Sequence, residues 1–429
     1  MQWATRPIAQ PKSMIIPASL LPASLLSEPL IGNRPWLCAS LLLAMLVTAC
    51  SDDDHQSNQN NENWDAGSQA DSGTNTNGTL TVTGDLIHGS SVVVSGSGFG
   101  QKDPAAPFRA SYQHPDQAQR FQEMGAFDDR YWSLGAADIM VNLADDLPDS
   151  RVKGRASQQY YARLEYSARG NWEAGGYSAG VQTNLPESKV LYLSWWDYFE
   201  PGFEASHMAT GAANFKWIYM SPGQNPHEAM QIINDGTDLL CSALGGIAGD
   251  TNDEQNANLD IPGGGGFYGR PLSWTSSYAL PIGRWYHVEL FYRLNSAPKT
   301  FDGSMELRID NQRIFRVQHI DVYDSESTPN EYFDNIRFGG NYGFDESGSV
   351  FYRQYGGIYL DGTFARVVLG DAPNYDDCRH LEVQIATQWS NGSITFTLNE
   401  GSFQAADTAY LYVFDASGQQ HGPASLVLE

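Results

Sequence analysis

A row of polar aromatic side chains is predicted along one side of a strand at residues 190–199. Side chains alternate with period two along a strand, which puts four residues on this side: Tyr192, Ser194, Trp196 and Tyr198. Such a row suits a sugar ring, because its C–H face packs on an aromatic ring and its hydroxyl groups need hydrogen-bond partners. This side is therefore predicted to be the floor of a glycan-binding groove. The alternative is an ordinary aromatic-rich strand of a β-sandwich.

The residue spacing gives less support to a glycosidase site or a calcium site. Asp197 and Glu200 are three residues apart and fall on opposite faces of a strand, so they do not form the carboxylate pair of a retaining glycosidase. The acidic loop 249–260 offers oxygen ligands at alternate positions, which leaves a structural Ca²⁺ open. It lacks the glycine and glutamate of an EF-hand, since Gln255 and Ile261 stand there, and a solvated loop is the alternative. No other cofactor is predicted.

Composition and charge indicate the fold class and the kind of partner. The chain has 429 residues, room for two or three domains, and is rich in turn-forming and aromatic residues, with 42 Gly, 22 Tyr, 19 Phe and 11 Trp. Without a long helical period, this composition favours an all-β protein. The net charge of −25 repels nucleic acid, which is therefore excluded as a partner. An anionic ligand would need a local basic patch.

The first 50 residues are typical of a targeting segment. Arg34 precedes the apolar run 41–47, and L-V-T-A-C at 46–50 resembles a bacterial lipobox, in which the peptide is cut before a cysteine that receives lipid. The resemblance implies a signal peptide at 1–49 and lipidation of Cys50. The lipid would be the only membrane contact and would hold the protein at the bacterial outer membrane, on its periplasmic or cell-surface side. An ordinary signal peptide, or a short membrane anchor, with an incidental cysteine is the alternative.

The segment after Cys50 is almost wholly polar. Residues 50–78 cannot bury a core and are predicted to be a disordered tether. The folded part then has two cysteines, Cys241 and Cys378. In an oxidising compartment they could pair or stay free, and the sequence leaves both possibilities open.

Short strand patterns occur at both ends of the folded part. H-G-S-S-V-V-V-S-G-S-G-F-G at 88–100 resembles the opening of IPT/TIG immunoglobulin-like domains, and four alternating runs within 381–429 resemble later strands of that family. We predict one small immunoglobulin-like sandwich, split into 79–106 and 376–429, with a large domain at 107–375 inserted in a loop. Two unrelated small β elements are the alternative.

The inserted domain reads as strand after strand without a helix, which is typical of two packed antiparallel sheets. G-R-W-Y-H-V-E-L-F-Y-R-L-N at 283–295, D-G-S-M-E-L-R-I-D-N-Q at 302–312 and I-Y-L-D-G-T-F-A-R-V-V-L-G at 358–370 resemble the concanavalin A-like lectin/glucanase superfamily and its jelly-roll polysaccharide lyases. The resemblance implies an all-β jelly-roll β-sandwich. It says little about activity, because the superfamily includes lectins, glycosidases, lyases and adhesion modules.

The resemblance also implies site roles. A jelly-roll lyase removes the proton α to a uronate carboxylate, with a tyrosine or histidine as base and a cation or amide on the carboxylate. The catalytic candidates are His207, Lys216 and Tyr219. The ligand-binding candidates are Tyr192, Trp196, Tyr198, His287, Arg293, Arg353 and Tyr355. Surface or structural duty is the alternative for each.

Taken together, these patterns predict a surface or periplasmic lipoprotein that binds polysaccharide through an aromatic-lined groove without catalysis. The alternative is a polysaccharide lyase that cleaves a uronic-acid polymer by β-elimination. Whether the chain is an enzyme is left open by the sequence.

Overall fold

The structure, a computed structural model, describes the chain in thirteen segments. They are residues 79–110, 140–143, 160–167, 178–202, 215–222, 228–234, 239–244, 258–260, 265–267, 273–297, 300–320, 332–341 and 350–429. The proposed signal peptide, the tether, His207 and most of the acidic loop lie outside them. All described segments belong to the compact unit formed by residues 65–429.

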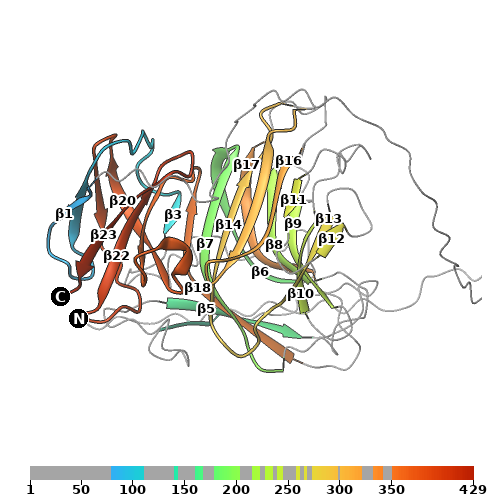
Figure 1. Ribbon diagram of the computed structural model, residues 1–429. Coiled ribbons are helices and arrows are strands. Elements are labelled where there is room, and N and C mark those ends of the chain that lie inside the picture. The colour runs from blue at the N-terminus through green and yellow to red at the C-terminus, as the bar shows by residue number, and fades with distance from the viewer. Residues whose placement is uncertain are drawn as a thin grey trace, which may run out of the picture. The chain divides into compact units, whose positions relative to one another are not determined.

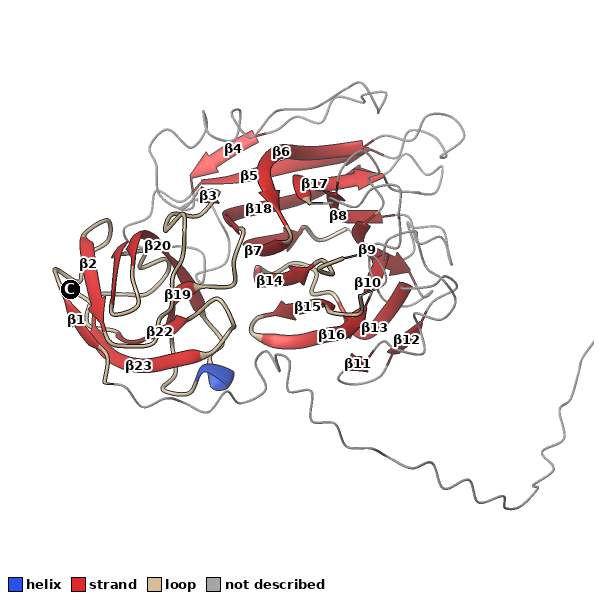
Figure 2. Cartoon of the chain, turned by 90° about the horizontal axis from the view of Figure 1, so that it is seen from above, coloured by secondary structure: helices blue, strands red, loops and turns tan. Residues whose placement is uncertain are grey.

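Regular structure within these segments is nearly all β, and the predicted fold class is confirmed (Figure 2). The described helix is one 3-10 turn, η4, at Tyr375–Asp377. No described helix is long and apolar enough to cross a membrane.

Strands from both ends of the folded part form one small sandwich, drawn in blue and red in Figure 1. Its order is β1 (Thr81–Thr83), β2 (Ser91–Ser95), β21 (Ser393–Thr397), β20 (Leu381–Trp389), β19 (Arg366–Gly370), β22 (Thr408–Phe414) and β23 (Gln420–Val427). β2 pairs with β21 in antiparallel fashion, with Val94 opposite Ile394. Both side chains are fully buried in the core of the sandwich.

One strand of this sandwich lies outside the sequence range expected for it. β19 was assigned with the inserted domain, but it pairs with β20 and β22. Val367 and Leu369 explain the difference, because both side chains are buried in the core of the small sandwich. The chain therefore crosses into the sandwich between β18 and β19.

The other described strands form two antiparallel sheets, called the jelly roll below. The nine-stranded sheet has the order β11 (Asn258–Asp260), β16 (Gln312–Ile320), β15 (Gly303–Ile309), β14 (Tyr286–Arg293), β7 (Val190–Phe199), β18 (Val350–Asp361), β5 (Tyr160–Ser167) and β4 (Met140–Leu143), and β3 (Arg109–Ala110) pairs with β18. The seven-stranded sheet has the order β12 (Gly265–Phe267), β13 (Ser273–Ala279), β10 (Leu239–Leu244), β9 (Glu228–Asn234), β8 (Phe215–Pro222), β17 (Phe333–Asn341) and β6 (Ser178–Ser188).

The core between these two sheets is built on the apolar face of β7. The ring of Trp195 contacts Trp217 of β8 and Phe338 of β17 at centroid distances of 5.5 and 5.7 Å. All three side chains are buried, as are Leu191, Leu193 and Phe199. This face of β7 is therefore the core face that the alternation predicted, and burying large aromatic surfaces stabilises the contact between the sheets.

Candidate functional site

The opposite face of β7, predicted to be the glycan floor, is covered by the small sandwich. Tyr192 packs in one cluster with Tyr375, Tyr412 and other residues of that sandwich. Trp196 is 2% exposed and Tyr198 is 6% exposed. The aromatic row is therefore not an open groove, and this prediction is corrected: amphipathic rings also suit a wet or partly polar domain interface, where their hydroxyl groups find protein partners.

A buried arginine holds the middle of this domain interface. Arg366 of β19 lies with its guanidinium carbon 4.0 Å from the ring centre of Phe414 and 5.0 Å from that of Tyr192. The Tyr192 hydroxyl donates to Glu289 Oε1 at 2.7 Å, and Arg366 Nε is 3.8 Å from the same oxygen. Burial raises the pKa of Tyr192 well above its usual value, so this phenol is a fixed donor and not a base.

His287 also lies in this domain interface. It is 3% exposed, its Nε2 is 2.8 Å from Ser194 Oγ, and its ring lies 5.2 Å from the ring of Trp196. Burial lowers the pKa of His287, which favours the neutral ring. We conclude that His287 is not open to a ligand in this arrangement, contrary to its predicted binding role.

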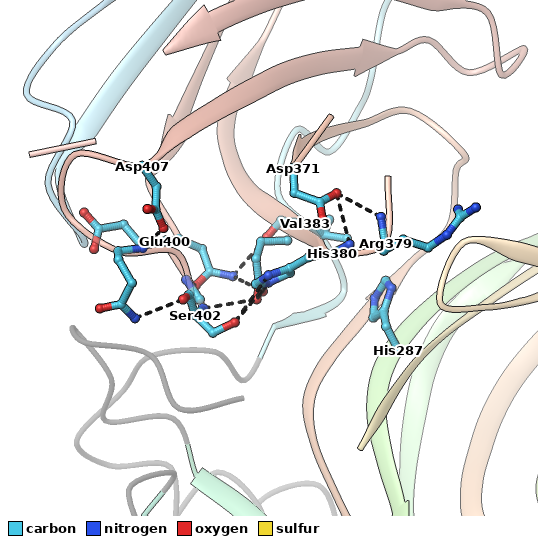
Figure 3. A network of polar contacts seen from close by, with 12 residues as sticks. His287, Asp371, Arg379, His380, Val383, Glu400, Ser402 and Asp407 are labelled. Atoms are coloured by element: carbon cyan, nitrogen blue, oxygen red, sulfur yellow. Dashed lines mark hydrogen bonds and ion pairs between the residues drawn. The ribbon is translucent and has the colours of Figure 1, made fainter. Parts of the chain in front are cut away.

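A polar network from the small sandwich meets the jelly roll beside His287 (Figure 3). His380 Nε2 is 2.7 Å from Glu382 Oε1, and its ring stacks on Phe403 at 4.5 Å with an interplanar angle of 12°. Ser402 Oγ is 3.2 Å from His380 Nε2, which also meets Glu382, and 3.4 Å from His380 Nδ1. The serine is thus closest to the nitrogen that bonds the acid, whereas in a nucleophilic triad the serine and the acid bond to different ring nitrogens. The network instead fastens the loop around Ser402 to β20.

Arg353 is placed inside the core between the sheets. Its side chain is fully buried, with Nη2 2.6 Å from Asp197 Oδ2 and Nε 2.9 Å from Asp197 Oδ1. Asp197 also accepts from the indole nitrogens of Trp195 at 2.9 Å and Trp217 at 2.6 Å. The guanidinium of Arg353 and the carboxylate of Asp197 neutralise each other in the core. Arg353 is therefore a structural residue, and its predicted contact with a ligand is corrected.

Two other predicted ligand contacts lie on the nine-stranded sheet. Arg293 is partly buried, with its guanidinium carbon 5.3 Å from the ring centre of Phe364, at the edge of the same domain interface. Tyr355 lies opposite Asp197 and Ala162 in the strand register. Neither position belongs to the seven-stranded sheet on which Lys216 and Tyr219 lie.

Lys216 and Tyr219 occupy β8, which contains a bulge. Lys216 lies opposite Gln231 and Ile218 opposite Met230, so Trp217 is the extra residue. An extra residue reverses the alternation beyond it. Strict alternation would put Lys216 and Tyr219, which are three residues apart, on opposite faces, whereas the bulge brings their positions onto one face. Trp217, the extra residue, and Ile218, the next residue, are both buried.

The neighbouring strand β17 adds a cation position to that face. Arg337 lies opposite Tyr219 of β8 and opposite Gln182 of β6. Its chain neighbours, Ile336 and Phe338, are fully buried in the core between the sheets. By alternation, the outer face of the seven-stranded sheet therefore carries five polar positions from four adjacent strands: Lys216, Tyr219, Gln231, Arg337 and Gln182.

Sequence reasoning missed three of these positions, Arg337, Gln182 and Gln231. The available signal was in N-I-R-F at 335–338, where a single arginine alternates with two large apolar residues. A phenol with two cations and two amides is the set of groups that can bind a carboxylate and move a proton next to it. The fold defines an all-β jelly-roll protein joined to a small β-sandwich.

Comparisons with known proteins find distant structural likenesses. No protein-family model matches the chain, and no curated protein matches it. Similar solved structures include endo-β-1,4-glucuronan lyase from the fungus Trichoderma reesei, which is 11% identical with a TM-score of 0.39, covering 60% of this chain and 97% of that chain. A marine alginate lyase from Aplysia kurodai is also 11% identical, with a TM-score of 0.38, covering 60% of this chain and 99% of that chain.

A third similar structure has no enzymatic description. It is the binding domain of botulinum neurotoxin serotype D/C, 9% identical with a TM-score of 0.29, covering 66% of this chain and 68% of that chain. At such identities and TM-scores these likenesses assign neither a substrate nor a reaction to this chain.

Proposed function

We propose that this protein binds a uronic-acid polysaccharide on the outer face of the seven-stranded sheet and cleaves it by β-elimination. The observation that carries the proposal is the register of β17 and β8, which sets Arg337 directly opposite Tyr219. Lys216 shares their face because of the bulge at Trp217. The aromatic row of β7 no longer supports a non-catalytic groove, because the small sandwich covers it.

The chemistry assigns a role to each kind of residue. Tyr219 takes the proton on the carbon α to the uronate carboxylate, and Arg337 or Lys216 neutralises the charge that develops on that carboxylate. Gln182 and Gln231 supply amide groups that orient the sugar. Tyr219 acts as the phenolate: the C–H bond breaks, a C=C bond forms, and the glycosidic C–O bond breaks, with the leaving oxygen taking up the proton that the Tyr219 oxygen removed.

The charge of the chain restricts where an anionic polymer could bind. The chain has a net charge of −25, so a polyanion is repelled by most of its surface. A local pair of cations is then needed for binding, and added salt should weaken the contact.

The test uses the complete chain with alginate, glucuronan and pectate, and follows the ultraviolet absorbance of the new C=C bond. We expect Tyr219→Phe to abolish the absorbance while binding persists, and Arg337→Gln to weaken both. The matched control is Arg313→Gln, which removes the same charge from β16 of the other sheet. Binding that Arg337→Gln weakens, with no absorbance from any polymer, would leave a glycan-binding protein without catalysis. Binding that Arg337→Gln does not alter would refute this face as the site.

We also propose that Cys50 carries lipid and holds the protein at the bacterial outer membrane, because L-V-T-A-C at 46–50 resembles a lipobox. Metabolic labelling with a palmitate analogue, followed by membrane fractionation, tests this. Cys50→Ser should release the protein into the soluble fraction. Unlabelled protein, or a serine variant that stays in the membrane, would contradict the proposal.

A further inference from the structure

A lysine and an aspartate meet where the chain passes between its two domains. Lys102 lies in the segment that leads from β2 of the small sandwich to β3 of the jelly roll. Asp361 is the last residue of β18, directly before the chain returns to the sandwich at β19. Lys102 Nζ lies 2.6 Å from Asp361 Oδ2, and the two side chains are 0% and 3% exposed.

The surroundings of this pair are aromatic. Lys102 Nζ lies 5.5 Å from the ring centre of Trp389 and 6.0 Å from that of Tyr359. The Tyr359 hydroxyl donates to Asp361 Oδ2 at 2.8 Å and lies 3.3 Å from Lys102 Nζ. One phenol therefore touches both the amine and the carboxyl oxygen.

Burial makes the charged forms of both groups costly. Desolvation lowers the pKa of Lys102 and raises the pKa of Asp361, and their mutual attraction offsets this only in part. Passing one proton from the ammonium to the carboxylate gives a neutral amine beside a neutral carboxylic acid. A neutral amine is a nucleophile, whereas an ammonium is not.

Three other ion pairs lack this possibility. Their cations are arginines or a histidine: Arg353 with Asp197, Arg308 with Glu306 and His380 with Glu382. A guanidinium stays protonated in proteins and does not attack a carboxyl group. In the pair of Lys102 with Asp361, by contrast, a primary amine and a carboxyl group are held together away from water.

We propose that Lys102 and Asp361 condense spontaneously into an isopeptide bond after the chain folds. The lone pair of Lys102 Nζ attacks Asp361 Cγ, and the N–C bond forms. Oδ2, which received the lysine proton, becomes the leaving group, and the Tyr359 hydroxyl, 2.8 Å from Oδ2 and 3.3 Å from Nζ, gives its proton to Oδ2 and takes the proton that the new N–C bond releases from Nζ. The C–O bond then breaks and one water molecule leaves, so the reaction needs no further reagent.

The bond would join the two points at which the chain crosses between domains. The backbone here is close-packed, because a side chain at Gly362 would come within 2.4 Å of the Phe108 ring. An amide at this point closes a covalent loop around the jelly roll and keeps the small sandwich on the nine-stranded sheet.

Peptide mapping of the full chain by mass spectrometry tests the proposal. We expect a branched peptide that contains Lys102 and Asp361 and is lighter than its two linear parts by one water molecule. The linear peptides containing these residues should be lost to the same extent, and trypsin should not cut after Lys102. Lys102→Arg keeps the charge but removes the nucleophile, so it should restore the linear peptide that carries Asp361.

Tyr359→Phe provides a second variant, in which the branched peptide should form more slowly after refolding. The wild-type chain by itself is decisive, even where a variant fails to fold. Recovery of both linear peptides in full from folded wild-type protein, with trypsin cutting after Lys102, would overturn the proposal and leave a buried ion pair.

Discussion

The ring of Trp196 on β7 meets the ring of His380 from the small sandwich edge-on, with centroids 5.8 Å apart and an interplanar angle of 86°. This contact identifies what the polar aromatic face of β7 does. Trp195, the preceding residue, packs into the core between the jelly-roll sheets, so β7 is buried on both faces. A polymer must therefore be sought on another sheet face, and the outer face of the seven-stranded sheet carries the polar positions.

Truncating Trp196 should affect stability and leave ligand binding intact. Trp196→Ala removes a buried indole from the domain interface, and we expect a loss of about 3 to 5 kcal/mol in the free energy of unfolding. Urea unfolding followed by circular dichroism measures this. A variant as stable as the wild type that no longer binds uronate polymer would show that Trp196 contacts the ligand after all.

Removing Arg353 should leave Asp197 charged and unpaired inside the core. We expect Arg353→Ala to cost about 3 to 5 kcal/mol, because breaking one side of a buried ion pair leaves the other uncompensated. Arg284→Ala is the control, since Arg284 is 41% exposed in its pair with Asp310 and this pair should be worth about 1 kcal/mol or less. Equal losses in the two variants, measured by urea unfolding, would argue against a dominant role for the core pair.

Acid should weaken the domain interface through His287. Burial lowers its pKa in the folded state, whereas an unfolded histidine titrates near 6.5. The unfolded chain therefore binds the proton more readily, so stability is full above about pH 6.5 and is lost as pH falls through that value toward the lower folded pKa. Glu289, Glu382 and Asp310 oppose the shift without reversing it.

The measurement is the free energy of unfolding of wild type and His287→Gln between neutral pH and the mildly acidic range. The glutamine variant should lose less stability on acidification than the wild type, because it has no proton to gain there. Parallel curves for the two proteins would mean that other groups cause the acid sensitivity.

Replacing Arg337 should weaken the binding of an acidic polymer. A hydrogen bond to a charged group contributes about 1.5 to 3 kcal/mol, so Arg337→Gln should raise the Kd roughly ten- to a hundred-fold. Calorimetry with a uronate oligosaccharide measures the change, and raising the salt concentration should reduce the difference between the proteins. An unchanged Kd in the variant would place the ligand elsewhere.

Gly401 sits against the carboxyl group of Glu382, which meets His380 Nε2. Its φ is +55°, and a Cβ atom there would lie 1.9 Å from the Glu382 carboxyl carbon. Gly401→Ala should therefore displace Glu382 from His380 and cost more than backbone strain alone, which is about 1 to 3 kcal/mol. Gly100→Ala is the matched control, because its φ is +68° with nothing within 4 Å of the added atom. Equal losses in the free energy of unfolding of the two variants would show that the contact with the Glu382 carboxyl group does not contribute.

The sequence alone determined the fold class, and it showed β patterns at both ends and in the middle of the folded part. Period-two alternation identified the core face of β7, because apolar side chains at every second residue must be buried together. The same alternation could not find the bulge at Trp217, since a bulge depends on the partner strand and leaves no mark in the spacing of β8. That is why Lys216 and Tyr219 appeared to face opposite ways.

Only the tertiary structure decided which surface covers which. The residue types of Tyr192 and Trp196 do not distinguish a ligand groove from an interface, because an amphipathic ring suits both a sugar and a neighbouring domain. The sequence around Arg353 does not show that Asp197, which is distant in the chain, neutralises its charge. Long-range pairing places Arg337 beside Tyr219 and Lys102 beside Asp361, and such pairings arise from the packing of whole sheets and not from local sequence.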